Sequence, residues 1–313
     1  MMVRSLQPLP SRLADSIDIL TLGARIVIVL PDQTNVWFVR WGRIHCMHLV
    51  VCIKQILDPE IPPADFRLDA KSEQAAAGSA AQVISIFDEN ALEVALQARD
   101  SAGGGKITAI SVGPPTAVDA LRKALSMRVD EAFLLPEENY PLLDAQGTAQ
   151  VLAAAVRKLE PVDVVLCGRE AGDWHGGIVA GFLAAELDRA YTSLVAACTI
   201  EGDKLRLRRQ TEDGWEIVES ATPAVISVTN DGGNLPRIPK VKDNMMAFRK
   251  QIPAWQADAI GLNASSAAGA NAALEKKGLS IPKVERNCEM IDGENSAEKA
   301  QRLVNKLAAL QVI

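Results

Sequence analysis

Three loops that follow apolar runs are the segments of this sequence best suited to chemistry. They are Cys52-Ile53-Lys54, the stretch around Val112 and Gly113, and residues 168–179, which read Gly-Arg-Glu-Ala-Gly-Asp-Trp-His-Gly-Gly-Ile-Val. A glycine lets backbone approach a ligand closely, and a helix that follows offers unpaired N–H groups at the positive end of its dipole. Each loop alone also matches an ordinary strand-to-helix turn. Their occurrence at three strand ends favours a nucleotide site.

Motifs that would define an enzyme class are not found in the sequence. It contains no GxGxxG, GxSxG or HExxH, and Gly103-Gly-Gly-Lys106 lacks the spacing and hydroxyl of a P-loop. Glu170 and Asp173 carry carboxylates, but in a nucleotide loop these more often hold backbone or ribose hydroxyls, and His175 is interpreted as a loop residue. No catalytic residue is predicted, and whether the chain is itself an enzyme is left open.

Composition narrows the classes of partner. The 313 residues carry 33 Lys and Arg against 39 Asp and Glu, a net charge of −6, which is too acidic for a general nucleic-acid binder. The five cysteines show no CxxC spacing and the three histidines do not cluster with them. This pattern predicts no metal site and a reducing compartment.

Apolar runs and helical patterns alternate from Met47 onward. Strands are expected at 49–53, 106–112, 131–135, 162–167 and 224–229, and helices at 88–102, 113–124, 147–159 and 176–187. Such alternation requires parallel crossovers and predicts an α/β fold, a doubly wound parallel sheet with helices on both faces. Residues 205–209 and 215–220 flank Glu212-Asp213-Gly214 and predict a hairpin.

The two ends of the chain differ in texture from this core. Residues 1–46 are interpreted as a non-native or disordered extension, because Met47 is followed at once by a buried-strand pattern; a real tail is the alternative. No run in this extension is long and apolar enough to predict a membrane span. Residues 264–274 look like a linker, and a strand at 284–290 and a helix at 296–310 complete a predicted arm suited to packing against another subunit.

Ordered blocks along residues 47–313 resemble the beta subunit of electron transfer flavoproteins. The blocks are Leu49-Val-Val-Cys-Ile-Lys-Gln-Ile-Leu-Asp58, Ile86-Phe-Asp-Glu-Asn-Ala-Leu-Glu93, Ser111-Val-Gly-Pro114, Ala124-Leu-Ser-Met-Arg-Val-Asp-Glu-Ala132, the long pattern from Arg209 to Ser227, and Asn234-Leu-Pro-Arg-Ile-Pro-Lys-Val-Lys-Asp-Asn-Met-Met246. The Arg209–Ser227 pattern is the most specific of these.

The resemblance implies one subunit of a heterodimer that handles electrons. Its fold would be Rossmann-like (adenine nucleotide alpha-hydrolase-like) over residues 47–235, with residues 236–313 forming a partner-docking loop and a C-terminal arm that wraps the alpha subunit. FAD would be held mainly by alpha, and this chain would bind AMP or a second FAD. By position, the pocket residues are Cys52, Ser85, Ile86, Phe87, Val112, Gly113, Asp173, Gly176, Gly177, Ile178 and Val179.

One loop departs from the family pattern. Electron-bifurcating members usually read Asp-Gly-Asp-Thr-Ala-Gln-Val-Gly where this chain has Asp173-Trp-His-Gly-Gly-Ile-Val-Ala180, so a hydroxyl and an amide donor are lost. AMP is therefore preferred over a second FAD, and the bifurcating type remains an alternative. A stand-alone adenine-nucleotide-binding regulatory module is the rival from another class.

The resemblance also implies a docking element and its partners. Val241 stands where the family places an apolar anchor for a partner dehydrogenase, and Pro236, Lys240 and Lys242 favour an extended, basic presentation. The two methionines at 245 and 246 are expected to provide packing for the helix that follows. The implied function is transfer of electrons from that dehydrogenase, through the alpha-held FAD, to a quinone reductase or similar acceptor. The expected location is the bacterial cytoplasm, with the mitochondrial matrix less favoured, without nucleic-acid binding or membrane insertion.

Overall fold

The computed structural model describes residues 18–22, 25–29, 36–39, 47–62, 65–69, 74–76, 80–136, 144–262, 280–281 and 288–313. The chain divides into two compact units. The first contains the main sheet and runs to Glu275 except for residues 66–78; the second combines 66–78 with 276–313. The division of function predicted at residue 235 stays a prediction.

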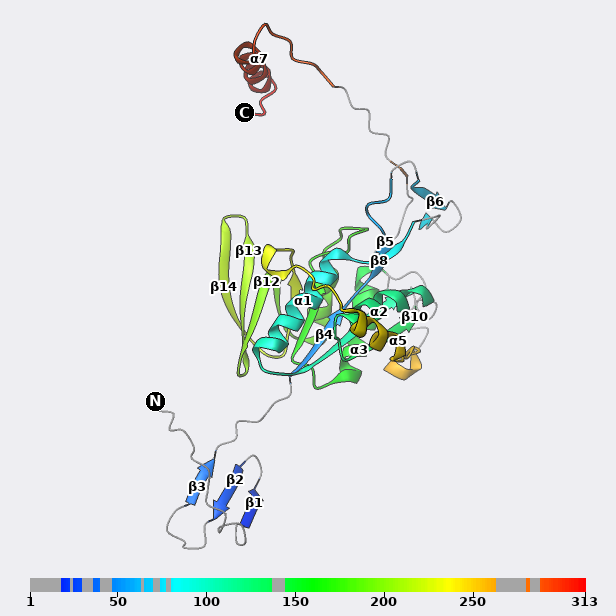
Figure 1. The fold of residues 1–313 in the computed structure, drawn as a ribbon, viewed down its shortest axis with the longest axis vertical. Helices are drawn as coiled ribbons and strands as arrows, with labels where there is room; N and C mark the ends of the chain where they lie inside the picture. Colours follow the sequence, from blue (N-terminus) through cyan, green and yellow to red (C-terminus); the bar gives the residue numbers. More distant parts are fainter. Residues whose placement is uncertain are drawn as a thin grey trace. The chain divides into compact units, whose positions relative to one another are not determined.

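An eight-stranded sheet forms the centre of the first unit (Figure 1). Its order is β10 (Glu131–Pro136), β9 (Lys106–Gly113), β4 (His48–Cys52), β11 (Val164–Gly168), β15 (Ala224–Val228), β12 (Ala190–Glu201), β13 (Lys204–Thr211) and β14 (Gly214–Ala221). The first six strands are parallel, and β13 and β14 are antiparallel. Counted along the chain, the six parallel strands have the order 3-2-1-4-6-5, which differs from that of the Rossmann fold only in the last two places.

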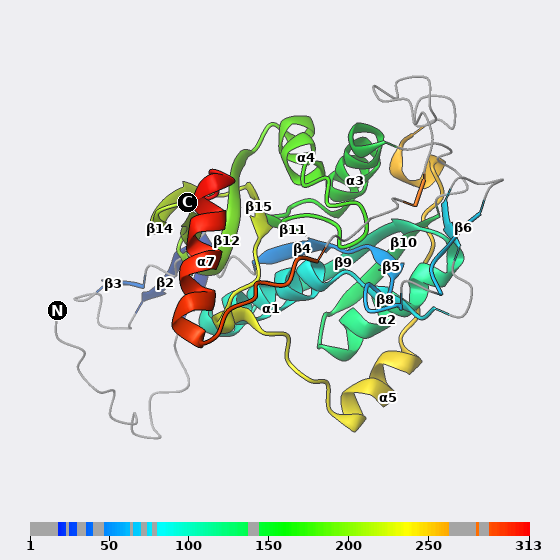
Figure 2. The same ribbon diagram turned by 90° about the horizontal axis from the view of Figure 1, so that it is seen from above.

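Helices cover both faces of the parallel strands (Figure 2). Helices α1 (Ile86–Ser101) and α2 (Val118–Ser126) pack on one face with Leu49, Val51 and Ile107, whereas α3 (Ala145–Leu159) and α4 (Val179–Leu187) pack on the other with Val50 and Val165. Alternate residues of one strand therefore enter opposite cores, as expected for a strand buried on both sides. The predicted α/β fold, with a mainly parallel sheet, is confirmed.

The predicted hairpin is present as β13 and β14. Thr211 pairs with Gly214 across the two-residue loop, and Gly214 has φ +135°, which favours glycine. Strand β12, which precedes the hairpin, was not predicted. Its register shifts between Thr192 and Val195, where Leu194 has φ 55°, so its side chains do not alternate regularly in burial.

Two further regions differ from the expectation based on the sequence. Helix α4 begins at Val179 instead of residue 176, because His175 (φ 51°) and Gly177 (φ 67°) adopt left-handed conformations that a helix excludes. The proline-rich stretch after β15 contains a short 3-10 turn, η3 (Gly232–Asn234), and a helix, α5 (Val241–Arg249), that packs against α2.

The remaining elements are small. Strand β5 (Gln55–Leu57) pairs with β8 (Gln82–Ile84) in the first unit. In the second, β6 (Arg67–Asp69) pairs with β7 (Gln74–Ala76), and α7 (Ser296–Ala309) confirms the predicted last helix. The predicted linker at 264–274 lies outside the described residues, as does most of the predicted strand at 284–290, of which Cys288–Met290 form no strand.

Within residues 1–46 the structure describes three short strands, β1 (Asp18–Leu22), β2 (Arg25–Val29) and β3 (Val36–Val39), paired as an antiparallel sheet. The interpretation of this segment as an extension ahead of Met47 stays a prediction. In the part of the chain that the structure describes, no helix combines the length and apolarity needed to cross a membrane.

Candidate nucleotide site

The carboxyl ends of β4, β9, β11 and β15 meet at one edge of the parallel sheet. This edge is where open α/β sheets bind ligands, because the loops that follow neighbouring strands converge there. The loops after β4 and β11 are joined by an ion pair, in which Lys54 Nζ lies 2.7 Å from Asp173 Oδ2 and 2.9 Å from Oδ1. Both side chains are partly exposed, so the pair positions the loops more than it stabilises the fold.

Asp88, in the first turn of α1, lies beneath this ion pair. Its carboxylate accepts the N–H of Lys54 at 2.8 Å and the N–H of Gly168 at 3.0 Å, so one side chain fixes the ends of β4 and β11. Burial raises the pKa of Asp88 to about 7, against the opposing effect of the two backbone N–H groups. A Cβ on Gly168 would lie 2.5 Å from Asp88 Oδ1, which requires glycine at that position.

The sequence alone indicates no role for Asp88 beyond an acidic first turn of the helix. What marked it was a carboxylate three residues into a helix that directly follows a strand, together with the glycine that ends β11. Neither signal identifies the other without the sheet order, because the two residues are 80 positions apart.

Ser85 connects α1 to the glycine-rich loop. It is the N-cap residue of α1, yet its hydroxyl caps no α1 amide and instead accepts the N–H of Gly172 at 3.3 Å. Its own N–H donates to the carbonyl of Lys54 at 2.9 Å. The structure therefore brings together the segments that hold Cys52, Ser85 and Asp173.

The loop after β11 presents backbone to solvent. His175 donates its N–H to the carbonyl of Ala171 at 3.0 Å, and the space beside Gly176 is open. Ile178 is the N-cap of α4 and supplies no side-chain cap. The amides that begin α4, starting at Val179, thus have no side-chain partner and lie at the positive end of the helix dipole, an arrangement suited to a phosphate.

Arg169 adds a positive charge to the site that the sequence pattern does not indicate. Its guanidinium lies 4.5 Å from the centre of the Phe87 ring and 3.0 Å from Glu170 Oε1, and it donates to Thr229 Oγ1 at 3.4 Å. Glu170 Oε1 is also 3.5 Å from His175 Nδ1. Phe87 is therefore the support of an arginine and not an open stacking surface.

Cys52 and Cys167 occupy neighbouring strand ends below the loops. Both are buried, and a hydrogen bond with the Cys167 thiol, with burial second, raises the pKa of Cys52 well above its usual range. A thiol held in its protonated form is not a nucleophile. Cys52 can line an adenine pocket but cannot supply covalent chemistry.

The other predicted pocket residues are less closely connected. Val112 is half-buried at the end of β9, a Cβ added to Gly113 would lie 3.0 Å from Ala117 Cβ, and Ile86 is exposed at the start of α1. Within the described ranges, no hydrogen bond joins Val112, Gly113 or Ile86 to the 173–179 loop. Their place in one pocket stays a prediction.

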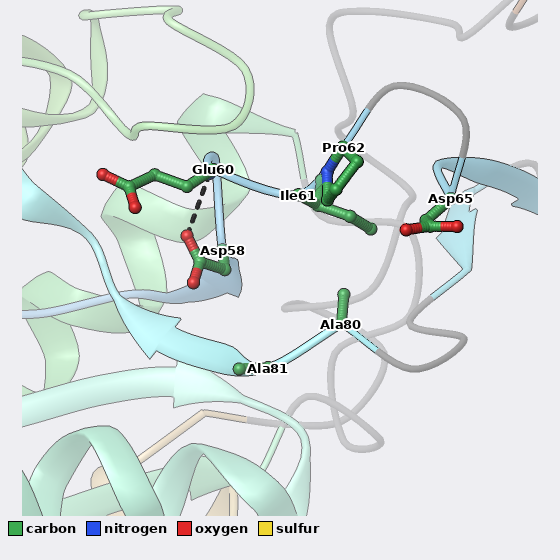
Figure 3. A pocket seen from close by; sticks show the side chains of 7 residues that line it. All are labelled: Asp58, Glu60, Ile61, Pro62, Asp65, Ala80 and Ala81. Atoms are coloured by element: carbon green, nitrogen blue, oxygen red, sulfur yellow. Dashed lines mark hydrogen bonds between the residues drawn. The ribbon is translucent and has the colours of Figure 1, made fainter.

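A separate hollow lies beside the loop after β5 (Figure 3). It is lined by Asp58, Glu60, Ile61, Pro62, Asp65, Ala80 and Ala81. Asp58 Oδ1 accepts the N–H of Glu60 at 2.9 Å, so this carboxylate stabilises its own turn. Three acidic side chains are unsuited to a phosphate, and this hollow is not the nucleotide site.

The predicted docking residues lie at the start of α5. Val241 is its first residue and is 78% exposed; Lys240 and Lys242 flank it and are also exposed, and Pro236 is half-buried. The expectation that Met245 and Met246 provide packing for this helix is wrong. Both are at least half exposed, because α5 turns only Ala247 into the core.

The sheet order and the loops at its carboxyl edge define a Rossmann-like protein with a site suited to a nucleotide phosphate. Comparison with known proteins gives the family. The sequence-family model of the electron transfer flavoprotein domain matches residues 75–260. The chain belongs to the electron transfer flavoprotein beta subunit family.

Several curated relatives extend over most of the chain. An electron transfer flavoprotein subunit beta from Thermoanaerobacterium thermosaccharolyticum is 34% identical over 268 residues, which are 85% of this chain and 100% of the relative. A caffeyl-CoA reductase-Etf complex subunit from Acetobacterium woodii is 32% identical with the same coverage. The subunit beta of Mycobacterium tuberculosis is 34% identical over 233 residues, 72% of this chain and 85% of the relative. These relatives support an electron transfer role.

Proposed function

We propose that this chain is the beta subunit of a heterodimeric electron transfer flavoprotein. Electrons from a partner dehydrogenase enter an FAD held mainly by the alpha subunit and leave to a quinone reductase or similar acceptor in the cytoplasm. The observation that carries the proposal is the carboxyl edge of the parallel sheet. Its loops are suited to binding a nucleotide, but the side chains described there are not reactive. Its carboxylates accept hydrogen bonds from backbone N–H groups or from the Lys54 ammonium group, and the Cys52 thiol stays protonated.

The residues present fit an adenine nucleotide in this chain. The uncapped start of α4, together with Gly176, which has open space beside it, and the left-handed Gly177, would hold phosphate through backbone N–H groups. Cys52 and Val112 would line the adenine, and Lys54 would exchange its contact with Asp173 for the phosphate. The loss of side-chain donors at Ile178 favours the smaller AMP over a second FAD. FAD, when bound in the heterodimer, supplies the redox chemistry, and this chain supplies position and charge.

The C-terminal arm is the proposed contact with alpha. Helix α7 has no buried residue and exposes Leu303 and Val304, and the residues Leu310, Val312 and Ile313 that follow it are also exposed. An amphipathic helix of this kind gains stability by covering its apolar side against a partner. The same feature disfavours a stand-alone regulatory module, because nucleotide binding alone needs no such arm.

Co-expression tests the proposal. The full chain is produced with and without an electron transfer flavoprotein alpha subunit, and the flavin absorbance of the purified protein is measured. Flavin retained only in the presence of alpha is the expected result. A stable, flavin-free monomer that ignores alpha would contradict the proposal and favour the regulatory module.

A further inference from the structure

Four polar side chains follow one face of α1. Asn90, Glu93, Gln97 and Asp100 are spaced three, four and three residues apart, which places them in a line along the helix. Asn90 and Glu93 are buried although their residue types are usually exposed. We call this set the α1 polar row. The nucleotide site uses none of its members, and each one binds the segment that runs from η3 to the start of α5.

The first contacts fix the start of that segment. Asn90 Nδ2 donates to the carbonyl of Asn234 at 3.0 Å, and Gln97 Nε2 donates to the carbonyl of Gly233 at 2.9 Å. Asn234 is itself fully buried, and its Nδ2 donates to the carbonyls of Ala196 (3.0 Å) and Thr229 (2.8 Å). The segment is therefore tied both to α1 and to the strand region behind it.

The central contact is an ion pair between Glu93 and Arg237. Glu93 Oε2 accepts the Arg237 backbone N–H at 3.1 Å and Nε at 2.8 Å, while Oε1 accepts Nη2 at 3.0 Å. Asp100 Oδ2 accepts the remaining Nη1 at 3.1 Å. The Glu93 side chain is only 6% exposed and that of Arg237 is 31% exposed, so the bidentate pair is largely shielded from water.

The residues just beyond this contact are the most exposed apolar ones of the segment. Ile238 is 91% exposed and Val241 78% exposed. Helix α5, which follows, is held at its far end by Arg122, whose Nη1 donates to the carbonyls of Ala247 and Lys250, both at 2.6 Å. A short apolar stretch is thus held on both sides, which reduces the entropy it loses when a partner binds.

We propose that the α1 polar row positions the docking stretch 238–241, with Glu93 and Arg237 as its principal pair. This inference rests on the proposed function and names the residues that present its docking surface. Glu93 and Arg237 are positioning residues, because they contact the backbone and side chains of the segment and leave Ile238 and Val241 free.

Hydrogen exchange in the full chain tests the positioning directly. Glu93→Gln and Arg237→Gln each remove one charged partner of the pair, and Arg237→Gln changes the more exposed of the two side chains. Each variant is expected to raise the exchange of amides 235–245 by roughly tenfold or more, with amides of β4 and β11 unchanged. The double variant is expected to match the single variants, because the pair acts as a unit. Glu219→Gln, which breaks the exposed pair with Lys204, serves as the matched control.

A second measurement distinguishes a role in presenting the docking stretch to the dehydrogenase from a purely structural role. With a dehydrogenase already shown to reduce the wild-type heterodimer, both variants should raise KM for that dehydrogenase roughly fivefold while kcat and flavin content stay unchanged. Unchanged exchange at 235–245, or raised exchange with unchanged KM, would overturn the inference. Failure of the proposed function would show in the wild type, as a heterodimer that no dehydrogenase reduces, and is distinguishable from either result.

Discussion

Asp88 offers the sharpest test of the site's electrostatics, through the variant Asp88→Asn. The amide has the size of the carboxyl group but does not titrate. In the folded chain burial raises the pKa of Asp88 from 3.8 to about 7. A shift of this size corresponds to about 4 kcal/mol, at roughly 1.4 kcal/mol per pH unit.

The sign follows from proton binding. Between pH 3.8 and 7 the folded state keeps the Asp88 proton and the unfolded state has released it. The contribution of this group to the free energy of unfolding is therefore complete below pH 3.8, falls as pH rises, and is lost above pH 7. The Asp88→Asn variant has no such dependence, although its amide leaves one of the two N–H groups of Lys54 and Gly168 without its acceptor, at a constant cost of about 1–2 kcal/mol.

Urea unfolding at pH 5, 6, 7 and 8 measures the difference between the two proteins. All other groups titrate alike in both, so their contributions cancel. The free energy of unfolding of the wild type, relative to that of Asp88→Asn, should fall by about 2.5 kcal/mol between pH 5 and 8. A difference that stays constant over this range would refute the argument that burial dominates at Asp88.

Three further predictions concern other parts of the chain. Val241→Asp should lower electron delivery from the dehydrogenase by about tenfold or more in stopped-flow reduction of the heterodimer, with flavin content unchanged, because it places a charge at an apolar contact; unaltered rates would remove Val241 as an anchor. Gly168→Ala should lower the free energy of unfolding by about 1–3 kcal/mol in urea titration, because the added Cβ meets Asp88 and Phe87; equal stability would contradict the close contact. Burial lowers the pKa of His48, which contacts Thr108 and the carbonyl of Pro161 and faces Lys106, Glu131 and Asp163. Acidification below pH 6.5 should therefore destabilise the wild type more than His48→Gln in thermal unfolding; parallel pH profiles would disprove this.

Much of the sheet could be predicted from the sequence because its strands are buried on both faces. Leu49–Ile53 is a continuous apolar run and Ala224–Val228 is interrupted only by Ser227. Such runs between helical patterns indicate a parallel sheet. Strand β12 could not be found in the same way. Its regular alternation is interrupted at Leu194, and several of its residues are small or polar, so its strand-favouring residues do not form one alternating pattern.

The sequence indicates the loops of the candidate site but not every side chain that joins them. The glycines of the 173–179 loop are visible as glycines, and their left-handed or open conformations follow from that residue type. Asp88 and Arg169 look like ordinary charged residues until the sheet order brings β4 and β11 together. Glu93 was missed for the same reason, since its partner Arg237 is 144 positions away.

The cofactor content of the heterodimer tests the central claim most directly. The full chain is purified with its alpha subunit, and released flavin and AMP are each quantified against protein. We predict one flavin and one AMP per heterodimer. In the variant Gly177→Val, whose side chain fills the left-handed position of the loop, we predict that AMP is lost before flavin. Two flavins without AMP would place a second FAD in the beta site. A heterodimer that contains neither flavin nor AMP would contradict an electron-carrying role for this chain.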